Sequence, residues 1–286
     1  GFRAPSLAQV YYNLRFTNFN SGGSTEVLLS PNNSPITQAF GINKLNEEKA
    51  VNGSLGVTAS FGAFTATVDG YFINVKDRIV LTGYFDATEI DPNVEEAQFF
   101  VNGIDTKTAG VDIVLAWKKK FGDSNFAATL VGNINHMTIG DVKNGTLDKE
   151  IFFGEREKKF LLASAPANKF GLNLNYDKKW FNAGLAFTRF SKVELLDYQM
   201  YEDVADYGSF ADQIKAATDT YNAKIVTDLT LGFKLNKSSK LSIGANNLFN
   251  IYPDQQDDWV EAGGSWDAVQ MGFSGAYYYA RLGFTF

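Results

Sequence analysis

The chain is built from stretches in which hydrophobic and polar residues alternate one by one. Side chains of a β-strand point to opposite faces in turn, so this pattern predicts strands with one apolar and one polar face. The last stretch shows it at full length, with Tyr278, Ala280, Leu282, Phe284 and Phe286 on one face. At about eleven residues it is longer than an ordinary soluble strand and has the length of a strand that crosses a bilayer at a tilt.

Eight earlier stretches alternate in the same way, and each predicts a strand. They lie at residues 51–61, 64–72, 106–118, 126–134, 169–176, 181–188, 225–235 and 241–245. The second extends toward Leu81, and the third can begin as early as Gln98. The opening residues predict the end of one more strand, stopped by Pro5. We therefore expect nine full strands and the end of a tenth.

The connections between these strands are alternately short and long. The short turns lie near residues 62–63, 119–125, 177–179 and 236–239, and bulky aromatic residues flank them: Phe61, Phe64, Trp117, Phe126, Tyr176 and Phe181. Short turns on one side, long loops on the other and an aromatic girdle are typical of an outer-membrane β-barrel, with periplasmic turns and extracellular loops. A closed barrel also satisfies every backbone hydrogen bond in lipid. A soluble β-sandwich or propeller would alternate too, but it explains neither regularity.

The segments outside these strands are harder to assign. Residues 1–50 are polar after their first strand end and predict an extended loop, with a short strand at 10–12. A short surface helix is predicted from Phe210 to Thr220, with Ser209 as its N-cap. No run approaches eighteen apolar residues, so no transmembrane helix is predicted.

Composition adds few candidates for chemistry. The net charge of −6 argues against a nucleic-acid partner. The single histidine, His136, is followed only by Thr138 at a suitable spacing, and there is no Cys/His cluster, so we expect no enzyme, metal centre or cofactor. Asp254, Asp257 and Asp258 cluster in a long loop; a calcium site is one interpretation and a solvated acidic loop the simpler one.

A barrel of this kind would bind its ligand with the long loops and the lumen. Tyr198, Tyr201, Trp259 and Trp266 are the candidates for stacking on a ligand, because exposed aromatic loop residues often mark binding sites. Packing between loops explains these residues equally well. The strand pattern places a further group of polar residues on the lumen face: Asn133, Asn135, Asn173, Asn175 and Asp228.

Four segments give the chain a family resemblance. Residues Gly1, Phe2, Arg3, Ala4 and Pro5 begin a GFRAPSL stretch, and residues 45–49 read LNEEK. Asn247, Leu248, Phe249 and Asn250 form NLFN, and the final aromatic strand ends at Phe286. In this order, the four segments resemble motifs of TonB-dependent outer-membrane receptors, where the LNEEK segment corresponds to an L-x-P-E-K pattern and the final strand to a C-terminal assembly signal. If Phe2 and Ala4 face lipid, the alternation of the strand places Arg3 on the lumen face, and we expect it to have a structural hydrogen-bonding role.

The resemblance implies a larger protein than this chain. Receptors of the family have a barrel of about 22 strands filled by an N-terminal plug. Residues 1–286 would then supply about ten C-terminal strands, without the plug. The implied partners are outer-membrane lipid, the remainder of the receptor, the TonB complex acting through the plug, and an extracellular small-molecule or glycan ligand. The implied function is import of a scarce bulky ligand (an iron chelate, cobalamin or an oligosaccharide) across the outer membrane of a Gram-negative bacterium. A self-contained small barrel that acts as an adhesin or structural protein is the alternative.

Overall fold

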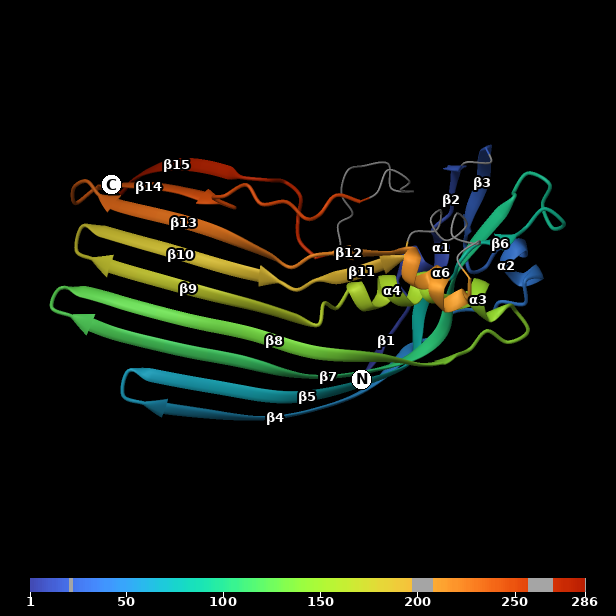
Figure 1. The fold of residues 1–286 in the computed structure, drawn as a ribbon, viewed down its shortest axis with the longest axis horizontal. Coiled ribbons are helices and arrows are strands. Elements are labelled where there is room, and N and C mark those ends of the chain that lie inside the picture. The colour runs from blue at the N-terminus through green and yellow to red at the C-terminus, as the bar shows by residue number, and fades with distance from the viewer. Residues whose placement is uncertain (21–22, 197–207, 257–269, 286) are drawn as a thin grey trace.

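The computed structural model describes residues 1–20, 23–196, 208–256 and 270–285. One curved antiparallel sheet dominates it (Figure 1). In spatial order its strands are β1 (Phe2–Arg3), β4 (Glu48–Phe61), β5 (Phe64–Leu81), β7 (Glu96–Phe121), β8 (Ser124–Val142), β9 (Asn168–Lys178), β10 (Phe181–Phe190), β13 (Lys224–Lys234), β14 (Ser239–Asn246) and β15 (Tyr277–Phe284). These are the predicted nine strands and the end of a tenth. Among the described residues β1 and β15 have no partner on their outer sides, so the sheet is an open arc.

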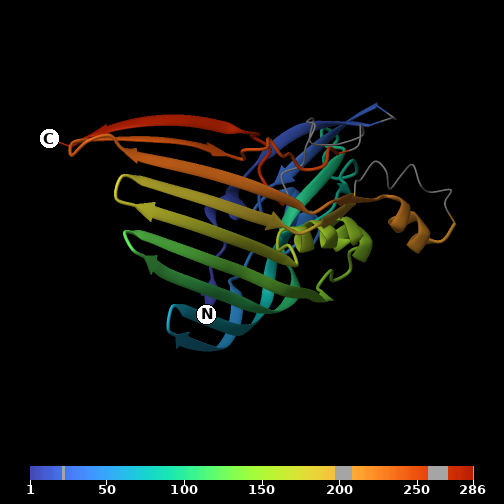
Figure 2. The ribbon, with the colours of Figure 1, turned by 60° about the vertical axis from the view of Figure 1, so that its left-hand side comes forward.

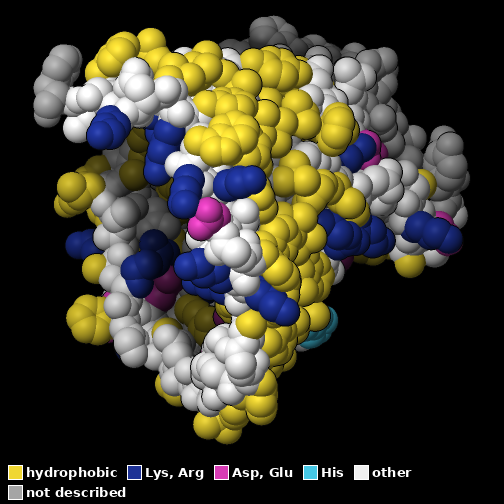
Figure 3. Space-filling model, turned by 90° about the vertical axis from the view of Figure 1, so that its left-hand side faces the viewer, with side chains coloured by type: hydrophobic (Ala, Val, Ile, Leu, Met, Phe, Trp, Pro, Cys, Tyr) yellow, Lys and Arg dark blue, Asp and Glu magenta, His cyan; other side chains and the backbone are white. Residues whose placement is uncertain are grey.

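The convex face of the arc is apolar from one edge to the other. Residues that lie directly opposite each other share a face, and one such row is Val57, Val68, Ile113 and Gly132. Leu55, in the adjacent row of the same face, is 83% exposed. Seen from the turn end, hydrophobic side chains cover this outer face, whereas charged and polar side chains line the hollow that the sheet encloses (Figure 3). An apolar outer wall around a polar interior is the arrangement of a transmembrane β-barrel.

Aromatic side chains mark the turn end of the apolar band. The ring centroids of Trp117 and Phe126 lie 5.7 Å apart, and those of Phe181 and Phe233 lie 5.3 Å apart. On β7 the band ends at Lys107, ten residues from Trp117, or roughly 33 Å at about 3.3 Å per residue. A strand tilted by about 40° then spans roughly 25 Å, the height of the apolar band of such barrels. No described helix has the length and hydropathy needed to cross a membrane.

The short turns gather at one end of the sheet and the long connections at the other (Figure 2). Several of these connections are folded, with three strands, β2 (Leu14–Asn20), β3 (Gly23–Ser30) and β6 (Phe85–Asp86), and four helices, α1 (Leu7–Tyr11), α2 (Pro35–Ala39), α3 (Lys149–Phe153) and α4 (Glu155–Ala163). A second, small sheet joins β11 (Val193–Leu196) to β12 (Thr218–Tyr221), with α6 (Phe210–Ala216) between them in the sequence. We call residues 14–46, 79–104 and 139–163 the loop domain.

The loop domain has a hydrophobic core of its own. Phe99 is fully buried, and its ring lies 5.1 Å from that of Phe40 and 5.9 Å from that of Phe85. Phe152 and Phe153 from α3 complete the core. It forms because β7 continues beyond the apolar band and pairs there with β3 in parallel, from Val27 opposite Glu96 onward.

The first fifty residues differ from the sequence prediction. Residues 10–12 do not form a strand, since 7–11 are helical: Ser6 caps α1 by accepting the Gln9 N–H at 3.2 Å, and the Gln9 side chain accepts the Ser6 N–H at 3.0 Å. This reciprocal capping box favours a helix start. The stretch after it forms the β2–β3 hairpin instead of an extended loop. The predicted helix after Ser209 exists but ends at Ala216, because residues 218–221 pair with β11.

Candidate functional site

The concave wall of the sheet is a polar surface, formed by every second side chain of each strand. Asn133 donates through Nδ2 to Asp112 Oδ1 at 2.7 Å and to the Tyr71 hydroxyl at 3.0 Å, and Asn135 donates to Asn133 Oδ1 at 2.9 Å. Further round the arc lies an open groove of about 370 Å³, lined in part by Asn173, Asn175, Asn182, Asp228 and Thr230. The five residues predicted to face the lumen all lie on this concave face. Their amides present both donors and acceptors, as a wall that contacts polar groups requires.

A second cavity lies in the loop domain. It holds about 310 Å³ between residues 40–46 and residues 143–147. Apolar and polar side chains share its lining: Phe40, Val101 and Phe152 with Asn43, Lys44 and Lys143. Its lining is about half polar and half apolar, which is more polar than the usual small-molecule site. Sequence reasoning missed this cavity because it joins segments that are far apart in the chain; the apolar Phe40 and Ile42 in an otherwise polar stretch were the only local signal.

Two of the segments that carry the family resemblance bind each other. Arg3 donates through Nε and Nη2 to the two carboxylate oxygens of Glu48, at 2.7 Å each. Glu48 Oε1 also accepts the Ile79 N–H at 2.7 Å. Burial opposes ionisation of Glu48, but the bonds from Arg3 and Ile79 outweigh it and hold the pKa of this carboxyl below its ordinary value. Arg3 thus fastens β1 to β4 and, through Glu48, to β5.

Replacing Arg3 with alanine is expected to loosen this junction by about 1–3 kcal/mol, because the buried Glu48 carboxylate loses two charge-assisted hydrogen bonds. Protection of the Ile79 amide against hydrogen exchange measures the effect. Arg3→Lys is the matched control: it keeps the charge but lacks the two-pronged geometry, and it should recover only part of the protection. Full protection in Arg3→Ala would show that the pair is incidental.

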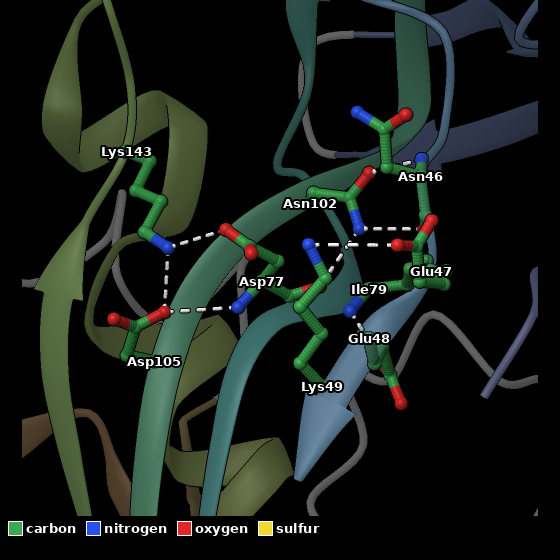
Figure 4. A network of polar contacts seen from close by, with 9 residues as sticks. All are labelled: Asn46, Glu47, Glu48, Lys49, Asp77, Ile79, Asn102, Asp105 and Lys143. Carbon is green, nitrogen blue, oxygen red and sulfur yellow. Dashed lines mark hydrogen bonds and ion pairs between the residues drawn. The ribbon is translucent and has the colours of Figure 1, made fainter. Parts of the chain in front are cut away.

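A network of hydrogen bonds continues from this junction across three strands (Figure 4). Asp77 occupies a β-bulge in β5 with φ of 57°, and its N–H donates to Asp105 Oδ1 at 2.9 Å. Lys143 Nζ lies 2.6 Å from both carboxylates. Asn102 donates to the carbonyls of Asn46 and Asp77 and accepts the Asn46 N–H. The network fastens the end of the apolar band to the loop domain, and the bulge redirects β5 at that point.

Acid should open this network. Burial raises the pKa of Asp105, but the bonds from Lys143 and the Asp77 N–H have the larger combined effect and lower it. A carboxyl with a lowered folded-state pKa contributes stability that is complete above about pH 4 and is lost as the pH falls through that lower value. Hydrogen exchange at the Asp77 amide should accelerate below about pH 4, beyond its intrinsic pH dependence. In Lys143→Met this acceleration should be much weaker; an equal response in both proteins would contradict the assignment to Asp105.

The NLFN segment forms the turn that follows β14. Asn247 and Asn250 have φ of 50° and 55°, a conformation that asparagine tolerates better than most residues. The Asn247 N–H donates to Asp228 Oδ1 at 2.7 Å, and its side chain exchanges two hydrogen bonds with the backbone of Ile251. Asn250 Oδ1 accepts the Ala276 N–H at 2.9 Å, just before β15. Leu248 and Phe249 complete the turn, which thereby positions the last strand.

The other residues singled out from the sequence are placed as follows. Seven of them lie outside the described residues: Tyr198, Tyr201, Trp259, Trp266, Asp257, Asp258 and Phe286. Asp254 accepts the Asn222 N–H at 2.6 Å and pairs with Lys224. His136 is exposed on the convex face, in line with Ile134. Within the described ranges no three acidic or histidine side chains are grouped to hold a metal ion.

The geometry defines a wall segment of a transmembrane β-barrel with a polar interior and folded loops at one end. The family model described as TonB dependent receptor-like, beta-barrel matches residues 1–248. The chain therefore belongs to this family, whose members are outer-membrane transporters and receptors of Gram-negative bacteria, not enzymes.

Solved structures show the same fold at low sequence identity. The ferric enterobactin receptor PfeA of Pseudomonas aeruginosa, in a mutant form, is 17% identical with a TM-score of 0.58, over 100% of this chain and 37% of its own. The siderophore receptor PirA of Acinetobacter baumannii is 17% identical with a TM-score of 0.57, over 100% of this chain and 38% of its own. The copper transporter OprC is 17% identical with a TM-score of 0.55, over 100% of this chain and 35% of its own. The chain thus spans little more than a third of these proteins. No curated protein sequence matches it.

Proposed function

We propose that residues 1–286 are the C-terminal part of the barrel of an outer-membrane receptor that imports a scarce, bulky ligand with energy delivered through TonB. The observation that supports this most is the arc itself. Its convex face is apolar, its concave face is polar, and its two edges, β1 and β15, have no partner among the described residues. Strand edges in lipid need partners, so further strands of the same receptor would complete the wall.

In this proposal the loop domain and the concave wall of the arc have different tasks. The loop domain faces the medium, captures the ligand, and keeps its shape because it has its own core. The amide-rich concave wall contacts a plug domain from the remainder of the receptor, which the periplasmic TonB complex pulls. The ligand then passes along the polar interior. This chain would supply wall and capture surface, not the coupling element.

The ligand would be an iron chelate, cobalamin or an oligosaccharide. Metal complexes are the first class to test, because the structures with the same fold are of a copper transporter and of siderophore receptors. These proteins share the fold of the chain at 17% identity. The aromatic residues Tyr198, Tyr201, Trp259 and Trp266 remain the candidates for stacking on the ligand.

The proposal is tested by uptake into intact cells that express the full-length protein. Radiolabelled ferric chelates, cobalamin and oligosaccharides are offered in turn, with and without a protonophore that collapses the inner-membrane gradient. Uptake of one class that stops with the protonophore supports the proposal. Binding without uptake, or uptake that is insensitive to the protonophore, would favour the alternative of a structural or adhesive barrel.

A further inference from the structure

Three asparagines of the chain are followed directly by glycine: Asn52 before Gly53, Asn102 before Gly103, and Asn144 before Gly145. Asparagine is among the less durable side chains of proteins. The backbone nitrogen of the following residue can attack its side-chain amide carbon, and a glycine has no side chain to hinder the approach. The attack requires a main chain that is free to bring the two atoms together, so the surroundings of each pair decide whether it reacts.

Two of the pairs are held within strands of the sheet. Asn52 and Gly53 belong to β4 and are paired with β5 at both positions. The Asn102 side chain, on β7, makes three hydrogen bonds to backbone groups of Asn46 and Asp77. These segments must open locally before the attacking nitrogen can reach the amide, and the opening costs free energy.

The third pair lies in an open turn after β8. Gly145 is exposed with φ of 59°, and a Cβ added to it would meet no atom within 4 Å. The Asn144 carbonyl accepts the Leu147 N–H at 3.0 Å, which closes the turn, but the Gly145 N–H has no hydrogen-bond acceptor among the described residues. One hydrogen bond, from Asn144 Nδ2 to the Leu147 carbonyl, holds the side chain. The attacking nitrogen is therefore accessible, and glycine can change its backbone conformation at little steric cost.

We propose that Asn144 is a site of spontaneous modification, at which the side-chain amide is converted to a carboxylate. The Gly145 nitrogen loses its proton and attacks Asn144 Cγ, a nitrogen–carbon bond forms, and the side-chain nitrogen leaves as ammonia. Water then opens the resulting cyclic imide at either of its carbonyls, which gives aspartate or isoaspartate. Water is the only co-reactant, and nothing is oxidised or reduced.

The modification changes the rim of the loop-domain cavity. Asn144 lines that cavity together with Lys44 and Lys143. A carboxylate at residue 144 adds a negative charge next to the lysine that holds Asp77 and Asp105. Neither product can donate the side-chain hydrogen bond to the Leu147 carbonyl, and isoaspartate also lengthens the main chain. Residues 143–147 should therefore loosen as the protein ages. The transport proposed above does not depend on this change.

Peptide mapping by mass spectrometry tests the site in the full-length protein, incubated at mildly alkaline pH in heavy-oxygen water. In the folded protein Asn144 should react at least about tenfold faster than Asn52 and Asn102, since a local opening that costs about 1.4 kcal/mol already slows a reaction tenfold. In the protein unfolded by urea the three sites should react at similar rates, because only the folded structure distinguishes them.

Asn144→Gln is the matched variant. Glutamine would have to form a larger ring and reacts far more slowly, so the peptide that contains residue 144 should stay unmodified. Hydrogen exchange of this peptide should accelerate as the wild-type protein ages, and in Asn144→Gln it should not. Equal rates at the three sites in the folded protein, or no product at Asn144, would overturn the inference and leave the proposed transport untouched.

Discussion

Replacing Phe99 with alanine is expected to destabilise the loop domain by about 3–5 kcal/mol, the usual cost of removing a fully buried phenylalanine. The ring is inaccessible to solvent and packs against Phe40 and Phe85. The cavity left behind would lie within a core of large side chains, including Phe40, Phe85 and Phe152, whose own packing limits how far they can collapse into it. The transmembrane strands should keep their stability, because their outer side chains contact lipid and not this core.

Hydrogen exchange read peptide by peptide separates these outcomes. In Phe99→Ala, peptides from residues 96–104 should lose protection at a lower urea concentration, while peptides from residues 109–117 on the same strand keep theirs. Ile90→Ala is the control, since Ile90 belongs to the loop domain but is 40% exposed and should cost well under half as much. Simultaneous loss of protection in both regions would mean that the loop domain and the barrel wall unfold as one unit.

Replacing Leu55 with arginine is expected to cost about 2–4 kcal/mol, because it places a charge on the lipid face near the middle of the apolar band. Leu55 is 83% exposed on the protein, which in water would make the substitution harmless. Ser54→Arg is the matched control: it introduces the same side chain at the same depth, but on the concave face. Urea unfolding of the full-length protein in lipid vesicles should be affected strongly by the first change and weakly by the second. Equal effects would show that the assignment of faces is wrong.

The transmembrane part of the fold could be predicted from the sequence because its pattern is local. One face of every strand contacts lipid, so the alternation around Val57 or Leu115 is complete and needs no distant partner to be recognised. The alternation of short turns and long loops then fixes strand order, since consecutive strands in such a sheet are neighbours. The bulge at Asp77 is the point where this regularity ends.

The loop domain could not be predicted for the opposite reason. Its core joins Leu28, Phe99 and Phe152, which are far apart in the sequence and lie in segments whose composition is polar overall. A parallel pairing such as that of β3 with β7 is not joined by a short turn, so no local turn sequence indicates that the two strands pair. The resemblance of the GFRAPSL and LNEEK segments to a family identified both as important, but only the structure shows that Arg3 and Glu48 bind each other.

The chain is expected to cross the outer membrane with its long loops outside and its short turns in the periplasm. Residues 1–286 contain no cysteine. Once any cysteine in the remainder of the receptor is replaced by serine, single cysteines can report on each side. Thr146 in a long loop and Ser238 in a short turn are both exposed. In intact cells that express the full-length protein, a membrane-impermeant maleimide should label Thr146→Cys at once and Ser238→Cys only after the outer membrane is permeabilised. Labelling of Ser238→Cys in intact cells, with Thr146→Cys protected, would contradict the account.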